Sequence, residues 1–341
     1  MAKTFSLSAN IENGFAEGTQ YLVTPNAQKA IHNIVNDFKS GIHSFTIIGS
    51  YGTGKSSFLL ALESDLKKTR KQNYLLDAKN LSDAKSFEIM NIVGDYAEMS
   101  TLLSKALNVE GNNTSILDSL KNYYTQCQKK GKFLLIVVDE FGKVLEHAAK
   151  NNPEKELYFL QKFSELVNLP TRQMMLLTTL HQNFGAYAKG LTEAQANEWT
   201  KVKGRFKEIT FVEPVEQLLY LASAQLREAN EVKRVNNISN LYELAKETRY
   251  VSKDFPIDTA IQLYPLDLFS AYTITTAIQR YGQNERSLFT FLAARGSNSI
   301  SEFEPTDHLT YNLQMVYDYI LYNFYSYLKD ANADSMSWST I

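Results

Sequence analysis

Residues 45–60 read FTIIGSYGTGKSSFLL and contain the pattern G-x4-G-K-S between Gly49 and Ser56. Residues 45–48 before the pattern have strand character, and the residues after it favour a helix. A strand, a glycine-rich loop and a helix in this order make up the phosphate-binding P-loop. Its glycines let successive backbone N–H groups converge on a phosphate at the helix N-terminus. The stretch therefore predicts a nucleotide site; an ordinary glycine turn is the alternative interpretation.

Two side chains of this loop carry most of the expected chemistry. Lys55 can reach the β- and γ-phosphates of ATP, and the Ser56 hydroxyl is placed to bind Mg²⁺. We expect the other residues of the loop to surround the phosphates: Gly49, Ser50, Tyr51, Gly52, Thr53, Gly54 and Ser57.

An acidic pair, Asp139 and Glu140, follows the apolar run 133–138. An uninterrupted apolar run is typical of a central parallel strand that is covered on both faces, and an acidic end makes it a Walker B strand. Asp139 is then expected to hold Mg²⁺, directly or through water, and Glu140 to polarise the attacking water. The pair therefore predicts hydrolysis, with a solvated acidic turn as the alternative.

Composition limits the classes of protein that the chain can belong to. Among 341 residues, 35 Lys and Arg stand against 37 Asp and Glu, so no overall basic field demands a nucleic acid partner. The single cysteine, Cys127, excludes an internal disulfide and a cysteine-based metal cluster. It also fits a reducing compartment. The longest clean apolar run, 133–138, is too short to span a membrane. We expect a cytoplasmic chain without a membrane partner.

Strands and helices alternate over the first two thirds of the sequence, which predicts an α/β fold with a parallel sheet. The expected helices include residues 25–38, most of 85–128 and 154–168. The expected strands after the first are residues 73–78, 133–138, 174–180 and 206–212.

Beyond Pro214 only helical patterns remain, which sets a domain boundary near residue 213. We expect an ATPase core with an N-terminal entry segment over 1–213 and a helical lid over 214–300. The lid helices are expected at 215–230, 238–248, 266–282 and 285–294. Residues 301–341 contain an aromatic helix and read as the start of a further, unfinished domain.

The strand 174–180 is expected to lie between the two strands that carry the P-loop and the acidic pair. The end of such a strand normally presents a polar group to the γ-phosphate or to the attacking water. Thr178, Thr179, His181 and Asn183 compete for that role, with Thr179 and His181 favoured. Satisfaction of backbone groups at the strand end is the alternative.

Two arginines are candidates for completing the site. Arg205 follows a glycine just before the last strand, where it can point towards the γ-phosphate of a neighbouring subunit. Its alternative is a surface arginine paired with a carboxylate. Arg286 lies in the first turn of a helix and could reach back over the phosphates, with a structural salt bridge as the alternative.

Together these residues resemble the AAA+ ATPases, over about residues 20 to 295, in the branch near origin-recognition initiators and STAND signalling ATPases. The resemblance implies a P-loop core of the additional-strand type followed by a helical lid. It makes Thr179 or His181 sensor 1, Arg205 the arginine finger and Arg286 sensor 2. The phrases GSYGTGKSSFL (49–59), KVKGRF (201–206) and GQNERSLFTFL (282–292) also look like large bacterial ATPases of anti-phage defence loci.

The expected function is that of an ATPase that forms homo-oligomers through its nucleotide site and remodels or moves a macromolecule. The alternative is a slowly hydrolysing, nucleotide-gated switch that scaffolds a signalling assembly. A kinase is less favoured because no acceptor site is evident. Nucleic acid and a partner effector protein are the candidate partners. Lys67, Lys68, Arg70 and Lys71 form a small basic cluster, for which a solvated helix end is favoured over a track for nucleic acid phosphates.

Overall fold

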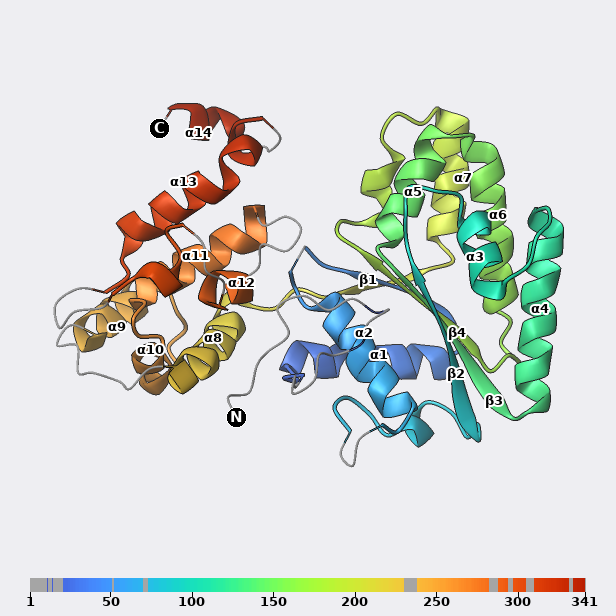
Figure 1. Ribbon diagram of the computed structural model, residues 1–341, viewed down its shortest axis with the longest axis horizontal. Coiled ribbons are helices and arrows are strands. Elements are labelled where there is room, and N and C mark those ends of the chain that lie inside the picture. Colours follow the sequence, from blue (N-terminus) through green and yellow to red (C-terminus); the bar gives the residue numbers. More distant parts are fainter. Residues whose placement is uncertain are drawn as a thin grey trace. The chain divides into compact units, whose positions relative to one another are not determined.

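The computed structural model describes residues 11, 14, 21–50, 52–69, 73–229, 238–281, 288–293, 297–304, 310–330 and 334–340. The chain divides into two compact units (Figure 1). The sheet unit spans residues 9–49 and 54–212, and the helical unit includes residues 50–53 and 213–341.

The sheet unit is built on five parallel strands in the order β2-β3-β4-β1-β5. Their bounds are β1 Ser44–Ile48, β2 Ser86–Val93, β3 Lys132–Asp139, β4 Met174–Leu180 and β5 Lys207–Thr210. Strand β4 therefore lies between the P-loop strand β1 and the acidic strand β3. This order confirms the predicted additional-strand P-loop fold.

Helices cover both faces of the sheet (Figure 1). One face carries α1 (Pro25–Lys39) and α2 (Lys55–Leu66), whose apolar residues share a core with alternate residues of β1, β3 and β4. The other face is covered by five helices: α3 (Met99–Leu107), α4 (Asn113–Lys129), α5 (Phe141–Lys150), α6 (Pro153–Val167) and α7 (Glu193–Lys203). Alternation along a strand accounts for the two cores, because successive side chains point to opposite faces.

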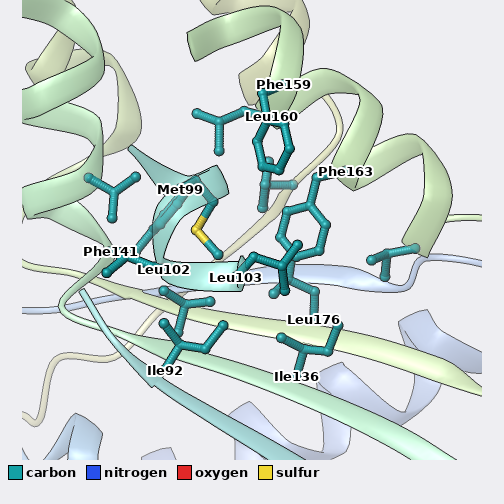
Figure 2. Close-up of a cluster of buried hydrophobic side chains, with 14 of the residues drawn as sticks. Ile92, Met99, Leu102, Leu103, Ile136, Phe141, Phe159, Leu160, Phe163 and Leu176 are labelled. Carbon is teal, nitrogen blue, oxygen red and sulfur yellow. The ribbon is translucent and has the colours of Figure 1, made fainter. Parts of the chain in front are cut away.

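The core beneath α3 and α6 anchors the carboxyl end of β3. In Figure 2, Met99 and Leu103 of α3 and Phe159 and Phe163 of α6 lie over the strands, with Leu103 and Phe163 towards Leu176 and Ile136. All of these side chains are buried. Each fully buried large apolar side chain contributes on the order of 2 kcal/mol, so this core holds the end of β3 firmly.

The prediction of a strand at residues 73–78 is wrong. The backbone N–H groups of Tyr74, Leu75 and Leu76 donate to the Asp65 carboxylate of α2 at 2.8, 2.7 and 3.1 Å. These donors are bound to a buried side chain, and the segment runs into a short 3₁₀ turn, η1 (Ala78–Asn80). The second strand is instead β2, within a region that was predicted to be mostly helical.

The helical unit contains α8 (Val215–Ala229), α9 (Ile238–Glu247), α10 (Ile257–Gln262), α11 (Leu268–Tyr281), α12 (Leu288–Ala293), η3 (Ile300–Glu302), α13 (Leu313–Asp330) and α14 (Ser335–Thr340). Its core gathers Leu219, Ile274, Phe291 and Ile320 from four of these helices. Within the described ranges, no helix is long and apolar enough to cross a membrane.

Candidate nucleotide-binding site

Glycines give the loop between β1 and α2 its backbone conformation. Gly52 and Gly54 have φ angles of 71° and 85°, in the left-handed region that favours glycine. The space around Gly54 is open, so the backbone angle and not crowding requires a glycine there. The Gly49 N–H donates to the Leu180 carbonyl at 3.1 Å, which ties the start of the loop to β4. Tyr51, a predicted phosphate-binding residue, lies outside the described residues.

The hydroxyl of Ser56 meets the carboxylate of Asp139. Ser56 Oγ donates to Asp139 Oδ2 at 2.7 Å, although the two residues come from α2 and β3, on either side of β4. A hydroxyl and a carboxylate are oxygen donors that suit Mg²⁺. No group of three or more His, Cys, Asp and Glu among the described residues forms a metal site. A Mg²⁺ ion at Ser56 and Asp139 would therefore take its other ligands from phosphate and water.

Thr179 of β4 fixes the acidic turn at the end of β3. Its hydroxyl donates to Asp139 Oδ1 at 2.5 Å and accepts the Glu140 N–H at 2.9 Å. Glu140 has a φ of 56°, which is uncommon for a residue other than glycine, and α5 begins at the next residue. Thr179 is fully buried, so its two hydrogen bonds hold this conformation without competition from water.

Lys55 is a buried cation at the start of α2. Its Nζ donates to the Gly49 carbonyl at 2.6 Å. Burial lowers the pKa of Lys55 to about 8, although the charges of Asp139 and Glu140 act to raise it. The side chain therefore keeps its charge at neutral pH, but it gives up its proton more readily than an exposed lysine.

His181 lies beside Lys55 at the end of β4. Its Nδ1 is 3.4 Å from Lys55 Nζ. Since an ammonium group can only donate, Nδ1 accepts and the ring proton of the neutral imidazole is on Nε2. Burial, followed by the charges of Lys55 and Lys143, lowers the pKa of His181 to about 3. The imidazole is therefore neutral at physiological pH.

Sequence reasoning missed two residues of this site. Lys143, one turn along α5, forms an ion pair with the Glu140 carboxylate, and the i,i+3 spacing of the two residues was the available signal. Gly94, directly after β2, donates its N–H to the Asp139 carbonyl at 2.7 Å. A Cβ on Gly94 would lie 2.4 Å from the Glu140 carbonyl oxygen. Its role could not be predicted without the correct position of β2.

The remaining predicted residues lie away from the acidic turn or outside the described residues. Thr178 shares a hydrogen bond of 2.9 Å with the Thr46 hydroxyl of β1. Asn183 accepts the Ala186 N–H at 2.9 Å and so caps the 3₁₀ helix η2 (Phe184–Ala188). Of the four candidates at the end of β4, Thr179 contacts the acidic turn and His181 contacts Lys55. Arg286 lies outside the described residues.

Arg205 lies between α7 and β5 and makes contacts within its own chain. Its Nη2 is 2.6 Å from Glu165 Oε1, and its Nη1 donates to the Lys201 carbonyl at 2.9 Å. These contacts agree with the alternative of an arginine paired with a carboxylate. A role at a neighbour's phosphate concerns a second copy of the chain and stays a prediction.

No protein-family model matches the chain. Among characterised proteins, it is 27% identical over 138 residues to the reverse gyrase of Methanocaldococcus jannaschii. That alignment covers 37% of this chain and 8% of the gyrase, so the chain spans a small part of this relative.

Three solved structures are similar over most of the chain. C. elegans PCH-2 has a TM-score of 0.40 and 14% identity, and the alignment covers 88% of this chain and 70% of that chain. The Aeropyrum pernix ORC2 protein has a TM-score of 0.43 and 14% identity, with 92% of this chain and 73% of that chain covered. The replication initiator DnaA bound to AMPPCP and single-stranded DNA has a TM-score of 0.38 and 13% identity, with 86% of this chain and 76% of that chain covered. Similarities this low carry no argument about function. The fold assignment rests on the strand order of the chain itself.

Proposed function

We propose that the chain binds ATP together with Mg²⁺ and hydrolyses it to ADP and phosphate. The hydrogen-bonded series Ser56–Asp139–Thr179 carries this proposal, because it joins the P-loop serine to the acidic strand across the inserted strand β4. This is the arrangement in which a hydroxyl and a carboxylate share a magnesium ion beside the phosphates. The metal, when bound, neutralises charge on the β- and γ-phosphates.

The remaining residues of the site have separate roles in the proposal. Lys55 neutralises the phosphates and exchanges its bond to Gly49 for bonds to phosphate oxygens. His181, with its proton on Nε2, can donate a hydrogen bond without adding a charge. Glu140 accepts a proton from the attacking water once its carboxylate leaves Lys143.

Glu140→Gln tests this proposal. The amide keeps the size of the side chain but cannot accept the proton, so turnover should fall by about 10²- to 10⁴-fold. ATP affinity should change little, since Ser56 and Lys55 are intact. ATPase rates and equilibrium binding of ATP measure the two effects. The matched control is Glu146→Gln, at an exposed position of α5, the helix that follows Glu140; this variant should hydrolyse ATP at the wild-type rate. Normal hydrolysis by Glu140→Gln would show that the assignment is wrong.

We further propose that the active form is an assembly in which Arg205 of one copy serves the nucleotide of the next. Such an assembly would use hydrolysis to remodel or move a macromolecule, for which nucleic acid and an effector protein are the candidates. The three phrases that look like defence ATPases support an anti-phage setting. Phage plating on cells that carry the wild-type or the Glu140→Gln chain tests this setting, and equal protection by both would contradict it.

A nucleotide-gated switch is the second candidate function, and the Lys143–Glu140 ion pair favours it. Glu140 must separate from Lys143 before it can accept a proton, and this additional step suits a protein that keeps its nucleotide. Turnover measured with and without DNA, RNA or candidate proteins separates the two functions. Strong stimulation by a polymer supports the motor, whereas very slow turnover with stably bound nucleotide supports the switch.

A further inference from the structure

The backbone of Arg205 is fixed at the amino end of the sheet. The Arg205 carbonyl accepts a hydrogen bond from Asn168 Nδ2 at 3.0 Å, and Asn168 Oδ1 accepts the His43 N–H at 3.1 Å. His43 directly precedes β1. In the β1–β5 pairing, Lys207 is opposite Phe45, so Arg205 lies level with the residues before β1. Arg205 is therefore at the end of β1 where the strand begins.

The P-loop follows the other end of the same strand. The five residues of β1 span about 16 Å at the usual rise per residue, which is longer than an arginine side chain. Arg205 consequently cannot reach a phosphate held by its own P-loop. If it meets a γ-phosphate, that phosphate is bound by a second copy of the chain.

The Glu165 carboxylate on α6 holds the guanidinium of Arg205 but does not depend on it. Besides Arg205 Nη2 at 2.6 Å, it accepts hydrogen bonds from Gln161 Nε2 at 2.9 Å and Lys162 Nζ at 3.0 Å. These three donors lower the pKa of Glu165 to about 2. When Arg205 leaves, Gln161 and Lys162 remain, so the charge on Glu165 is not left unpaired. The side chain is 38% exposed, and water can occupy the third position.

Separation of Arg205 from Glu165 therefore costs little free energy. A buried ion pair that loses one partner leaves a charge in a medium of low dielectric constant, whereas a half-exposed pair is worth little in water. The phosphates of ATP offer arginine a stronger, multiply charged acceptor. The exchange from Glu165 to a neighbour's phosphate is thus favourable once a second copy is present.

We infer that Glu165 is a positioning residue that holds Arg205 in the isolated subunit and competes with the neighbouring subunit's nucleotide for it. This inference rests on the proposed action of Arg205 at a neighbour's site. Glu165 thereby sets the protein concentration at which the assembly becomes active. It does not touch the reacting atoms.

The test compares ATPase activity over a range of protein concentrations for the wild type and Glu165→Gln. The substitution keeps an oxygen acceptor for Gln161 but removes the charge that competes with phosphate. The half-activating concentration should fall by about two- to fivefold, the fold-change that corresponds to an exposed ion pair. The rate at saturating protein concentration should not change. High salt should reduce the difference between the two proteins, because salt screens the exposed pair.

Glu198→Gln on α7 is the matched control. Glu198 also forms an i,i+3 pair with a lysine, Lys201, at 2.5 Å. The Glu198→Gln variant should leave the half-activating protein concentration unchanged. The double variant Glu165→Gln, Arg205→Ala should show no gain over Arg205→Ala, since the effect acts through the arginine. Thermal melting of each variant checks that the fold is intact.

Two results overturn different parts of the inference. If Arg205→Ala is inactive but Glu165→Gln leaves the half-activating concentration unchanged, the role of Glu165 is wrong and the proposed assembly stands. The role of Glu165 is also wrong if the gain persists in the double variant, which lacks the arginine. If Arg205→Ala is as active as the wild type at every concentration, the assembly itself is wrong, and the role of Glu165 fails with it.

Discussion

Lys55 is buried before any phosphate arrives, and we therefore expect the proposed binding of ATP to depend on pH. Its pKa of about 8 in the free chain should rise when the negative phosphates bind, so ATP binding takes up a proton above pH 8. Affinity should be constant below pH 8 and fall above it, by up to about tenfold per pH unit. Titrations of ATP between pH 7 and 9.5 measure the effect.

The control for this prediction is Lys55→Arg, because arginine keeps its charge throughout that pH range. Its affinity is expected to be weaker at every pH but independent of pH. A wild-type affinity that stays constant up to pH 9.5 would contradict the role given to Lys55. An equal decline in Lys55→Arg would point to another titrating group.

The side chain of Thr179 contacts both members of the acidic pair. Thr179→Val keeps the shape but removes both hydrogen bonds, so that Asp139 loses a donor and the Glu140 N–H keeps only its longer bond of 3.1 Å to Asp139 Oδ1. We expect the free energy of unfolding to fall by about 1–3 kcal/mol and turnover to fall with it. Urea denaturation and ATPase assays measure the two effects. Thr179→Ser retains the hydroxyl and should lose much less of both; an equal loss would mean that packing, not hydrogen bonding, matters here.

At the level of elements, the end of β2 supports the acidic turn by close backbone approach. In Gly94→Ala the new methyl group would meet the Glu140 carbonyl at 2.4 Å, so either β2 or the turn must shift. We expect a loss of about 1–3 kcal/mol in stability and a larger fall in turnover than in ATP affinity. Gly185→Ala is the control, since the nearest atom there is 3.4 Å away. Wild-type turnover in Gly94→Ala would show that the turn tolerates displacement.

The buried strands were predictable from the sequence, and the edge strand β2 was not. β3 contains the apolar run 133–138, β4 is apolar except for Thr178 and Thr179, both strands are buried along almost their whole length, and β4 has the predicted bounds. Strand β2 is only partly buried and mixes Glu88 and Asn91 with apolar residues, so its pattern does not separate a strand from a helix. The segment 73–78 has an apolar composition, but Asp65 binds its backbone donors.

As with the strands, only part of the candidate site could be predicted from the sequence. The P-loop and the acidic pair are continuous motifs, so the sequence alone predicts their positions and the chemistry to expect of them. The contacts that orient them join residues far apart in the sequence, such as Thr179 with Asp139 and Glu165 with Arg205. Those contacts depend on strand register and helix packing, which periodicity does not specify.

For the whole molecule, the proposed assembly predicts that two inactive variants complement each other. Glu140→Gln still carries Arg205, and Arg205→Ala still carries an intact acidic pair. In a random equal mixture, about one quarter of the sites combine an intact pair with a neighbour's arginine. The mixture should therefore regain about one quarter of the wild-type ATPase activity, as measured by phosphate release.

A mixture of Lys55→Ala and Glu140→Gln is the control for complementation. Both defects lie in the same half of the site, so no combination of subunits restores it. This mixture should stay inactive. Equal recovery in the two mixtures would show that the subunits do not share sites in the way proposed.

The strand order also determines when, during synthesis of the chain, each strand gains its neighbours in the sheet. Among the described strands β1 pairs with β4 and β5, and β4 leaves the ribosome about 130 residues after β1. At ordinary rates of translation that interval is on the order of 10 s, during which Phe45 and Ile47 have no strand beside them. The phosphate-binding loop is thus synthesised early but gains its sheet late. The proposed ATP site is therefore complete only after β4 has been added, so ATP cannot guide the folding of the chain before that point.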